Sequence, residues 1–184
     1  PSGKPPFYSR VKAPEPLPLT GLQRSWLKAV SADPRFRLFF TDEECRKLDL
    51  SLRNVQPLFY PEDFSYFDQY SDGDGYELDS YREHFQAVLE GIRENRILAI
   101  DYFSAKNHLT TFRYLPCRLE YSARDDKFRL MAVRVRKDDS LSRLTILNLS
   151  RIMRIKDTGK SLEIRPDIDA CLEHSLCREP VVLE

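Results

Sequence analysis

Arginine is the residue type in this chain that points most directly to chemistry, because five arginines fall in or beside short segments that alternate like β-strands. They are Arg113, Arg118, Arg129, Arg143 and Arg151. A planar guanidinium group donates two parallel hydrogen bonds, which suits phosphate and carboxylate groups. If these segments form one small sheet, several of the arginines lie close together as an anion site. The alternative is that each pairs with a local acid such as Asp101, Glu120 or Asp157.

The distribution of charge favours an anion site in the middle of the chain. The 184 residues have a formal net charge of zero. Residues 81–160 nevertheless carry 17 basic against 10 acidic side chains, whereas residues 1–80 carry 10 against 13 and residues 161–184 carry 2 against 6. A local surplus of +7 attracts anions even when the whole protein is neutral.

The sequence contains none of the common catalytic motifs. GxSxG, GxGxxG and GxxxxGK[ST] do not occur. The three histidines and four cysteines lack the spacing of metal ligands, and the cysteines are expected to be buried free thiols. No apolar run approaches the roughly 20 residues that span a bilayer. We therefore expect a cytoplasmic protein that is not an enzyme and uses neither a metal nor a cofactor.

The elements that would position the arginines are helices first and strands afterwards. Apolar spacing predicts helices over 20–30, 41–48 and 79–95, with Thr20, Thr41 and Asp79 as caps and Asp33-Pro34 ending the first. The period then changes to two, which predicts strands at 97–103, 109–114, 117–122, 127–136, 141–148 and 152–156. Pro116 is expected to separate the second strand from the third. The fold class is therefore α+β, mainly β, with helices preceding a small antiparallel barrel.

Four regions follow from this pattern. Residues 1–19 form an extended linker, because six prolines among the first eighteen residues exclude a helix. Residues 20–80 are a helical and aromatic-acidic connecting region, and residues 81–159 are the barrel domain. Residues 160–184 are a C-terminal extension, with one further strand at 162–165 and a short helix at 168–176.

The stretch 85–156 resembles a WYL domain. The resemblance rests on a helix leading into Ile100-Asp101-Tyr102, on Arg113-Tyr114-Leu115-Pro116, on Lys127-Phe128-Arg129-Leu130, and on the late arginines Arg143 and Arg151. Residues 17–35 resemble the segment that precedes this domain in bacterial WYL regulators. The tripeptide that names the family falls on Phe128-Arg129-Leu130, so an arginine replaces its tyrosine.

The resemblance implies an Sm-like, SH3-type barrel over 81–159 that senses a ligand for a winged-helix DNA-binding domain N-terminal to it, in a regulator expected to be a homodimer. It implies a positively charged pocket for a nucleotide or a short single-stranded nucleic acid. The pocket residues would be Tyr102, Arg113, Arg118, Arg129, Arg143 and Arg151. Tyr102 would stack on a base while arginines hold phosphates.

A second hypothesis needs no small ligand. In this alternative the chain is a protein–protein interaction or dimerisation module, and the aromatic residues Trp26, Phe39 and Phe40 contribute to its surface. Packing of these residues in a core explains them equally well.

Overall fold

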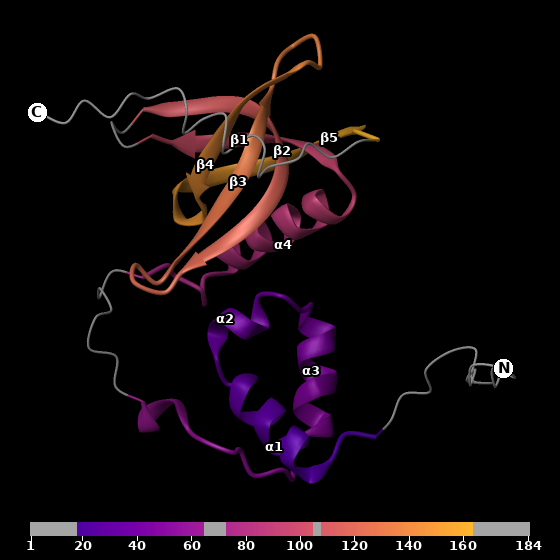
Figure 1. Cartoon of the computed structure of the whole chain (residues 1–184), viewed down its shortest axis with the longest axis vertical. Helices are drawn as coiled ribbons and strands as arrows, with labels where there is room; N and C mark the ends of the chain where they lie inside the picture. Colours follow the sequence, from indigo (N-terminus) through magenta and orange to yellow (C-terminus); the bar gives the residue numbers. More distant parts are fainter. Residues whose placement is uncertain (1–17, 65–72, 105–107, 164–184) are drawn as a thin grey trace, which may run out of the picture.

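The computed structural model describes residues 18–64, 73–104 and 108–163. Its elements are α1 (Gly21–Val30), α2 (Pro34–Arg37), α3 (Asp42–Ser51), the 3-10 turn η1 (Pro61–Asp63), α4 (Asp79–Arg93), β1 (Arg96–Phe103), β2 (Leu109–Ser122), β3 (Lys127–Val135), β4 (Leu141–Asn148), the 3-10 turn η2 (Leu149–Arg151) and β5 (Ile152–Ser161). Figure 1 shows α1–α3 grouped at one end of the molecule and the sheet with α4 at the other. In these ranges, no helix combines the length and apolarity needed to cross a membrane.

Helices α1 and α3 begin where the sequence predicts. Thr20 accepts the backbone N–H of Gln23 at 3.3 Å, and the Gln23 side chain accepts the N–H of Thr20 at 2.9 Å. Thr41 and Glu44 form the same reciprocal pair at the start of α3. Such capping boxes satisfy backbone donors that would otherwise have no partner, which fixes where each helix starts.

One prediction about helix boundaries is confirmed and another is wrong. Asp33-Pro34 follows the end of α1, as predicted, and it also begins α2, because Asp33 accepts the N–H of Arg35 at 2.8 Å and Pro34 suits the first helical position. Asp79 was expected to cap α4, but Leu78 is the capping residue and makes no side-chain capping bond. Asp79 instead lies in the first turn, where its negative charge suits the helix dipole.

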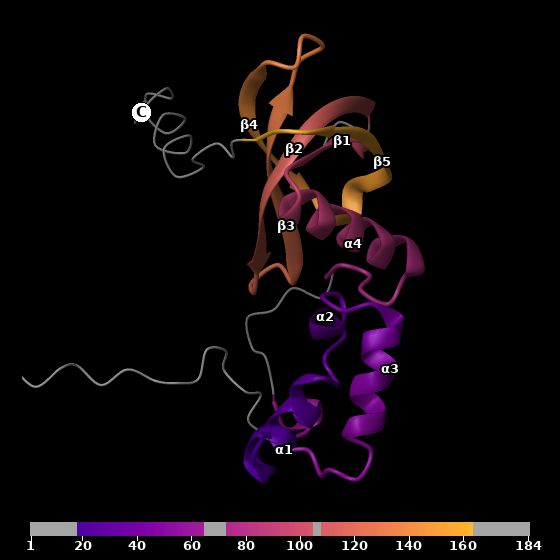
Figure 2. The same ribbon diagram turned by 90° about the vertical axis from the view of Figure 1, so that its right-hand side faces the viewer.

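The five strands form one antiparallel sheet in the order β4-β3-β2-β1-β5. Strands β4 and β5 are its two edges and do not pair with each other in the described part of the chain, so the predicted barrel is not closed. The three residues of η2 carry the chain from one edge strand to the other. Because so short a connection cannot cross a flat sheet, the sheet curls and brings its edges toward each other, as Figures 1 and 2 show.

The predicted break at Pro116 is also wrong, because β2 is one strand that runs through this residue. A bulge between Pro116 and Arg118 changes the register with β3. Tyr114 precedes the bulge and Leu119 follows it, and both pack on the same core although they are five residues apart. In a regular strand these two side chains would point to opposite faces, so the bulge keeps the second half of β2 in phase with the core.

Helix α4 covers the inner face of the curled sheet. Phe85 and Val88 on α4 are fully buried against Ile100 of β1 and Leu130 of β3. The outer face carries a second buried cluster that includes Leu115 and further β2 and β3 residues. Both faces of the sheet are therefore apolar, as the alternation in the sequence indicates.

Close approach of α4 to the sheet depends on Gly91. A Cβ atom at this position would lie 2.9 Å from side-chain atoms of both Leu98 and Pro116. We expect Gly91→Val to destabilise the protein by about 1–3 kcal/mol, since the added atoms force α4 away from its neighbours. Urea unfolding measures this change. Gly21→Ala in α1 is the matched control, because nothing lies within 4 Å of its Cβ position and no loss of stability is expected there.

The β2–β3 turn joins the sheet to the helical region. Arg35 forms an ion pair with Asp126 at 3.3 Å and also bonds the hydroxyl of Tyr121. The hydroxyls of Tyr76 and Tyr121 donate to the Asp126 carboxylate at 2.9 and 2.7 Å. The backbone N–H of Asp74 donates to the carbonyl of Asp126 at 3.0 Å. Asp126 thus connects α2, the segment before α4 and the sheet.

Several predictions lie partly or wholly outside the described residues. The linker is described only from residue 18 onward, and residues 65–72 of the aromatic-acidic region are not described. The strand predicted at 162–165 is described only at its first two residues, which follow β5, and the helix at 168–176 is outside. Cys45 and Cys117 are buried free thiols, as predicted, whereas Cys171 and Cys177 lie outside.

Candidate anion-binding site

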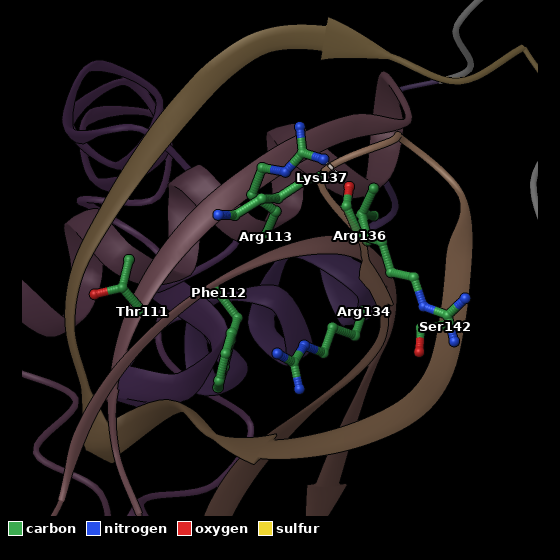
Figure 3. Close-up of a pocket in the computed structure, with 8 residues that line it drawn as sticks. Thr111, Phe112, Arg113, Arg134, Arg136, Lys137 and Ser142 are labelled. Atoms are coloured by element: carbon green, nitrogen blue, oxygen red, sulfur yellow. Dashed lines mark hydrogen bonds between the residues drawn. The ribbon is translucent and has the colours of Figure 1, made fainter.

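A pocket of about 610 Å³ opens at the end of the sheet that lies away from α1–α3 (Figures 1 and 3). Strand β2, the end of β3, the turn that follows it and the start of β4 supply its walls. The lining residues are Thr111, Phe112, Arg113, Arg134, Val135, Arg136, Lys137 and Ser142. Among the described residues that line it, four are cationic and none is a carboxylate. The pocket therefore presents a positive charge density suited to an anion.

Arg134 is one of the two half-buried cations that line this pocket. Its guanidinium carbon lies 3.5 Å from the centroid of the Phe112 ring. The side chain is half-buried and makes no hydrogen bond or ion pair with any described residue. Stacking on an aromatic ring contributes about 0.5–2 kcal/mol and holds the guanidinium group flat. Its N–H groups therefore remain available to an external acceptor. Figure 3 shows the Arg134 side chain beside the Phe112 ring.

Arg143 directly follows the pocket residue Ser142 in β4. Burial raises the pKa of the Tyr114 hydroxyl, while the positive charges of Arg134 and Arg143 oppose that rise. The positive charges of both guanidinium groups therefore act on the Tyr114 hydroxyl. Arg143 is exposed and does not line the pocket itself, so it adds positive charge beside it.

Arg113 lines the pocket but is already paired. Its Nη1 lies 2.8 Å from Oδ1 of Asp139, and its Nη2 donates to the backbone carbonyl of Arg136. The second oxygen of Asp139 lies 2.6 Å from Nζ of Lys160 on β5. Arg113 is thus held by the β3–β4 turn, in contrast to Arg134.

The structure separates the remaining predicted arginines from the pocket. Arg118 pairs with Glu120 at 2.8 Å, and Arg129 pairs with Asp125 at 2.5 Å. Both lie in the half of the β2–β3 hairpin that leads toward α2. Arg151 is exposed in η2. Of the six residues predicted from the sequence, Arg113 lines the pocket. Arg143 does not line it but follows the lining residue Ser142.

Tyr102 lies in the core rather than on an open platform. It packs against the main core cluster, and its hydroxyl accepts the N–H of Asn148 at 3.3 Å. The aromatic ring that accompanies the pocket cations is Phe112. Phe128 and Leu130, from the tripeptide aligned with the family name, are also buried, so these positions stabilise the fold.

Sequence reasoning missed seven of the eight residues that line the pocket, and among these seven are its aromatic ring and three of its cations: Phe112, Arg134, Arg136 and Lys137. A signal for one of them is present in the sequence. Phe128, Leu130 and Ala132 alternate toward the core, and Arg134 continues the same phase. An arginine at a core-facing position near a strand end is unusual, because burying an unpaired charge is costly. Such a position indicates a site that needs the charge.

Comparison with known proteins finds a structural similarity but no match among family models or curated sequences. No protein-family model matches the sequence, and no curated protein matches it. Among solved structures, the chain is similar to proteasome accessory factor B/C (PafBC) of Arthrobacter aurescens, with 18% sequence identity and a TM-score of 0.39. That similarity covers 79% of this chain and 21% of PafBC, so the chain spans about a fifth of that protein's length.

Proposed function

We propose that this chain is the ligand-sensing module of a bacterial WYL-type transcriptional regulator. The pocket beside Arg134 would bind an anionic, nucleotide-like ligand or a short single-stranded nucleic acid. The sequence resemblance over 85–156 supports the family, and a helix followed by a curled, five-stranded antiparallel sheet agrees with an Sm-like fold. A winged-helix DNA-binding domain and a homodimer belong to the same proposal.

One observation carries the ligand proposal: Arg134 is half-buried and stacked on Phe112, yet no described residue neutralises it. A partly desolvated charge is unfavourable unless a partner of opposite sign compensates it. The neighbouring cations Arg136 and Lys137 are exposed and open to the same pocket. A ligand that combines a planar group with phosphates meets both features, by stacking on the guanidinium face and by pairing with the cations.

Such a ligand would act by differential binding. It shifts a regulator between two states only to the extent that it binds one state more tightly than the other. The route toward the helical region runs along β2 and β3, whose turn at the far end holds Asp126 and its bonds to α2. A change in the curl of the sheet at the pocket would therefore alter the contact with α1–α3.

Titration with nucleotides tests this function. A fluorescein-labelled short oligothymidylate and ATP are titrated against the purified chain at two salt concentrations. If Arg134, Arg136 and Lys137 each contact a phosphate, log K for the oligonucleotide falls with log salt with a slope of about −2. Absence of any salt-sensitive binding would exclude the proposed function.

An apolar stripe on α1 supports the alternative function. Leu22 is 68% exposed and Trp26 51% exposed, one turn apart on the same face of the helix. Phe39 is also 44% exposed, although its ring packs edge-on against Phe85 and Phe128. Exposed apolar side chains in one stripe are typical of protein interfaces. Concentration-dependent dimerisation that Trp26→Ser abolishes, without anion binding, would favour the interaction module.

A further inference from the structure

The β3–β4 turn places its own carboxylate against the candidate pocket. Asp139 has a backbone φ of +63°, in the left-handed region, and donates its N–H to the carbonyl of Arg136 at 3.0 Å. Asparagine, aspartate and glycine adopt this conformation more readily than other residues. The turn therefore holds the Asp139 side chain in a defined place beside Arg113.

Two cations from different strands form ion pairs with the Asp139 carboxylate. Arg113 of β2 lies 2.8 Å from one oxygen, and Lys160 of β5 lies 2.6 Å from the other. Hydrogen bonds from Lys160 and Arg113 hold the pKa of Asp139 below its ordinary value. The carboxylate is therefore charged at neutral pH, and it occupies the guanidinium edge that Arg113 would otherwise offer to a ligand.

The adjacent acid in the same turn behaves differently. Asp138 accepts the backbone N–H and the hydroxyl of Ser140 at 3.2 and 2.7 Å. Its charge interacts weakly with Arg136, and it has no ion pair with Arg113 or Lys160 in the described structure. The two aspartates thus carry the same charge in the same turn, but only Asp139 bonds a pocket cation.

Building on the proposed function, we propose that Asp139 is an internal competitor for the anion pocket. In the ligand-free chain its carboxylate occupies Arg113, and a phosphate group binds there by displacing it. A dianionic phosphate with three acceptor oxygens replaces a monoanionic carboxylate favourably, whereas a simple carboxylate ligand gains nothing by the exchange. The exchange makes the site selective for phosphates.

Replacing the competitor tests this inference. Asp139→Asn keeps the left-handed turn and removes the charge, and we expect it to tighten binding of ATP and of pyrophosphate about three- to tenfold, in line with the modest strength of exposed ion pairs. Asp139→Gly, which suits the same φ, provides a second variant with the same expectation. Asp138→Asn is the matched control, because it changes the net charge equally and should alter affinity less than about twofold.

A double variant shows whether Asp139 lowers the affinity for ATP through its contact with Arg113. In an Arg113→Ala background, Asp139→Asn should give no gain in affinity, because the cation under competition is absent. If wild type binds ATP and neither Asp139 variant binds more tightly than Asp138→Asn, the competitor is excluded while the proposed function stands. If neither the wild type nor any variant binds ATP, pyrophosphate or oligothymidylate, the proposed function is excluded, and the role of Asp139 as a competitor is excluded with it.

Discussion

Arg134→Ala is expected to weaken binding of ATP and oligothymidylate at least tenfold, which corresponds to about 1.4 kcal/mol or more. Arg134 is half-buried, stacked on Phe112 and without an anionic partner in the described structure, so its charge is available to a ligand in a partly desolvated place. Hydrogen bonds to charged groups contribute about 1.5–3 kcal/mol, more than a contact with a fully exposed lysine. Isothermal titration at constant salt measures the loss.

Arg129→Ala is the matched control for this experiment. It removes an arginine from the same strand, but one that pairs with Asp125 at the opposite end of the β2–β3 hairpin. Binding should change less than twofold. Phe112→Leu keeps an apolar contact and removes the stacking surface, so it should give a loss between the two. Equal losses for Arg134→Ala and Arg129→Ala would mean that net charge alone drives binding, and the pocket would no longer be the site.

The helices and most strands could be predicted because local signals specify them. Thr20 and Thr41 cap their helices through residues three positions away, and the strands follow a period of two. The errors arose where one residue has two compatible roles. Pro116 reads as a break between strands, but a bulge accommodates it inside β2. Closure of the barrel depends on pairing between β4 and β5, which are separated by η2, and no local pattern encodes such pairing.

The candidate site could be predicted only in part because the sequence gives the phase of a strand but not what covers each face. Arg113 and Arg134 belong to neighbouring strands, yet Arg113 pairs with a turn carboxylate and Arg134 with a ring. Whether an arginine has a partner depends on turn geometry, here on Asp139 and its left-handed backbone. The arginines were selected because they fall in or beside predicted strands, and the fold then separated Arg118 and Arg129 from the pocket.

The aromatic-acidic segment joins α4 to the sheet through Asp74. Asp74 is 8% exposed, and its Oδ2 accepts the hydroxyl of Tyr81 at 2.8 Å and the backbone N–H of Phe128 at 3.0 Å. Burial and the charge of Asp74 raise the pKa of Tyr81, so this hydroxyl remains a proton donor at any ordinary pH. Asp74 therefore fixes the start of α4 and the start of β3 together.

Asp74→Ala is expected to destabilise the protein by about 2–4 kcal/mol, because two buried donors lose their acceptor and each costs about 1–3 kcal/mol. The expected loss of stability is smaller than the sum of two such penalties. The other carboxylate oxygen of Asp74, Oδ1, is buried without a partner in the described structure, so its removal is a small gain. Urea unfolding followed by circular dichroism measures the change. Tyr81→Phe removes one donor and leaves the bond to Phe128, so it should cost about 1 kcal/mol.

The same experiment shows whether the helical region and the sheet unfold together. Trp26 is the single tryptophan and lies on α1, so its fluorescence reports the helical region, whereas circular dichroism reports both parts. If Asp126 couples the two parts through its ion pair with Arg35, the two signals coincide in wild type and shift together in Asp74→Ala. A shift of the circular dichroism transition alone would mean that α1–α3 is stable without the junction. Ligand binding at the far end of the sheet would then have no route through Asp126 to the helices.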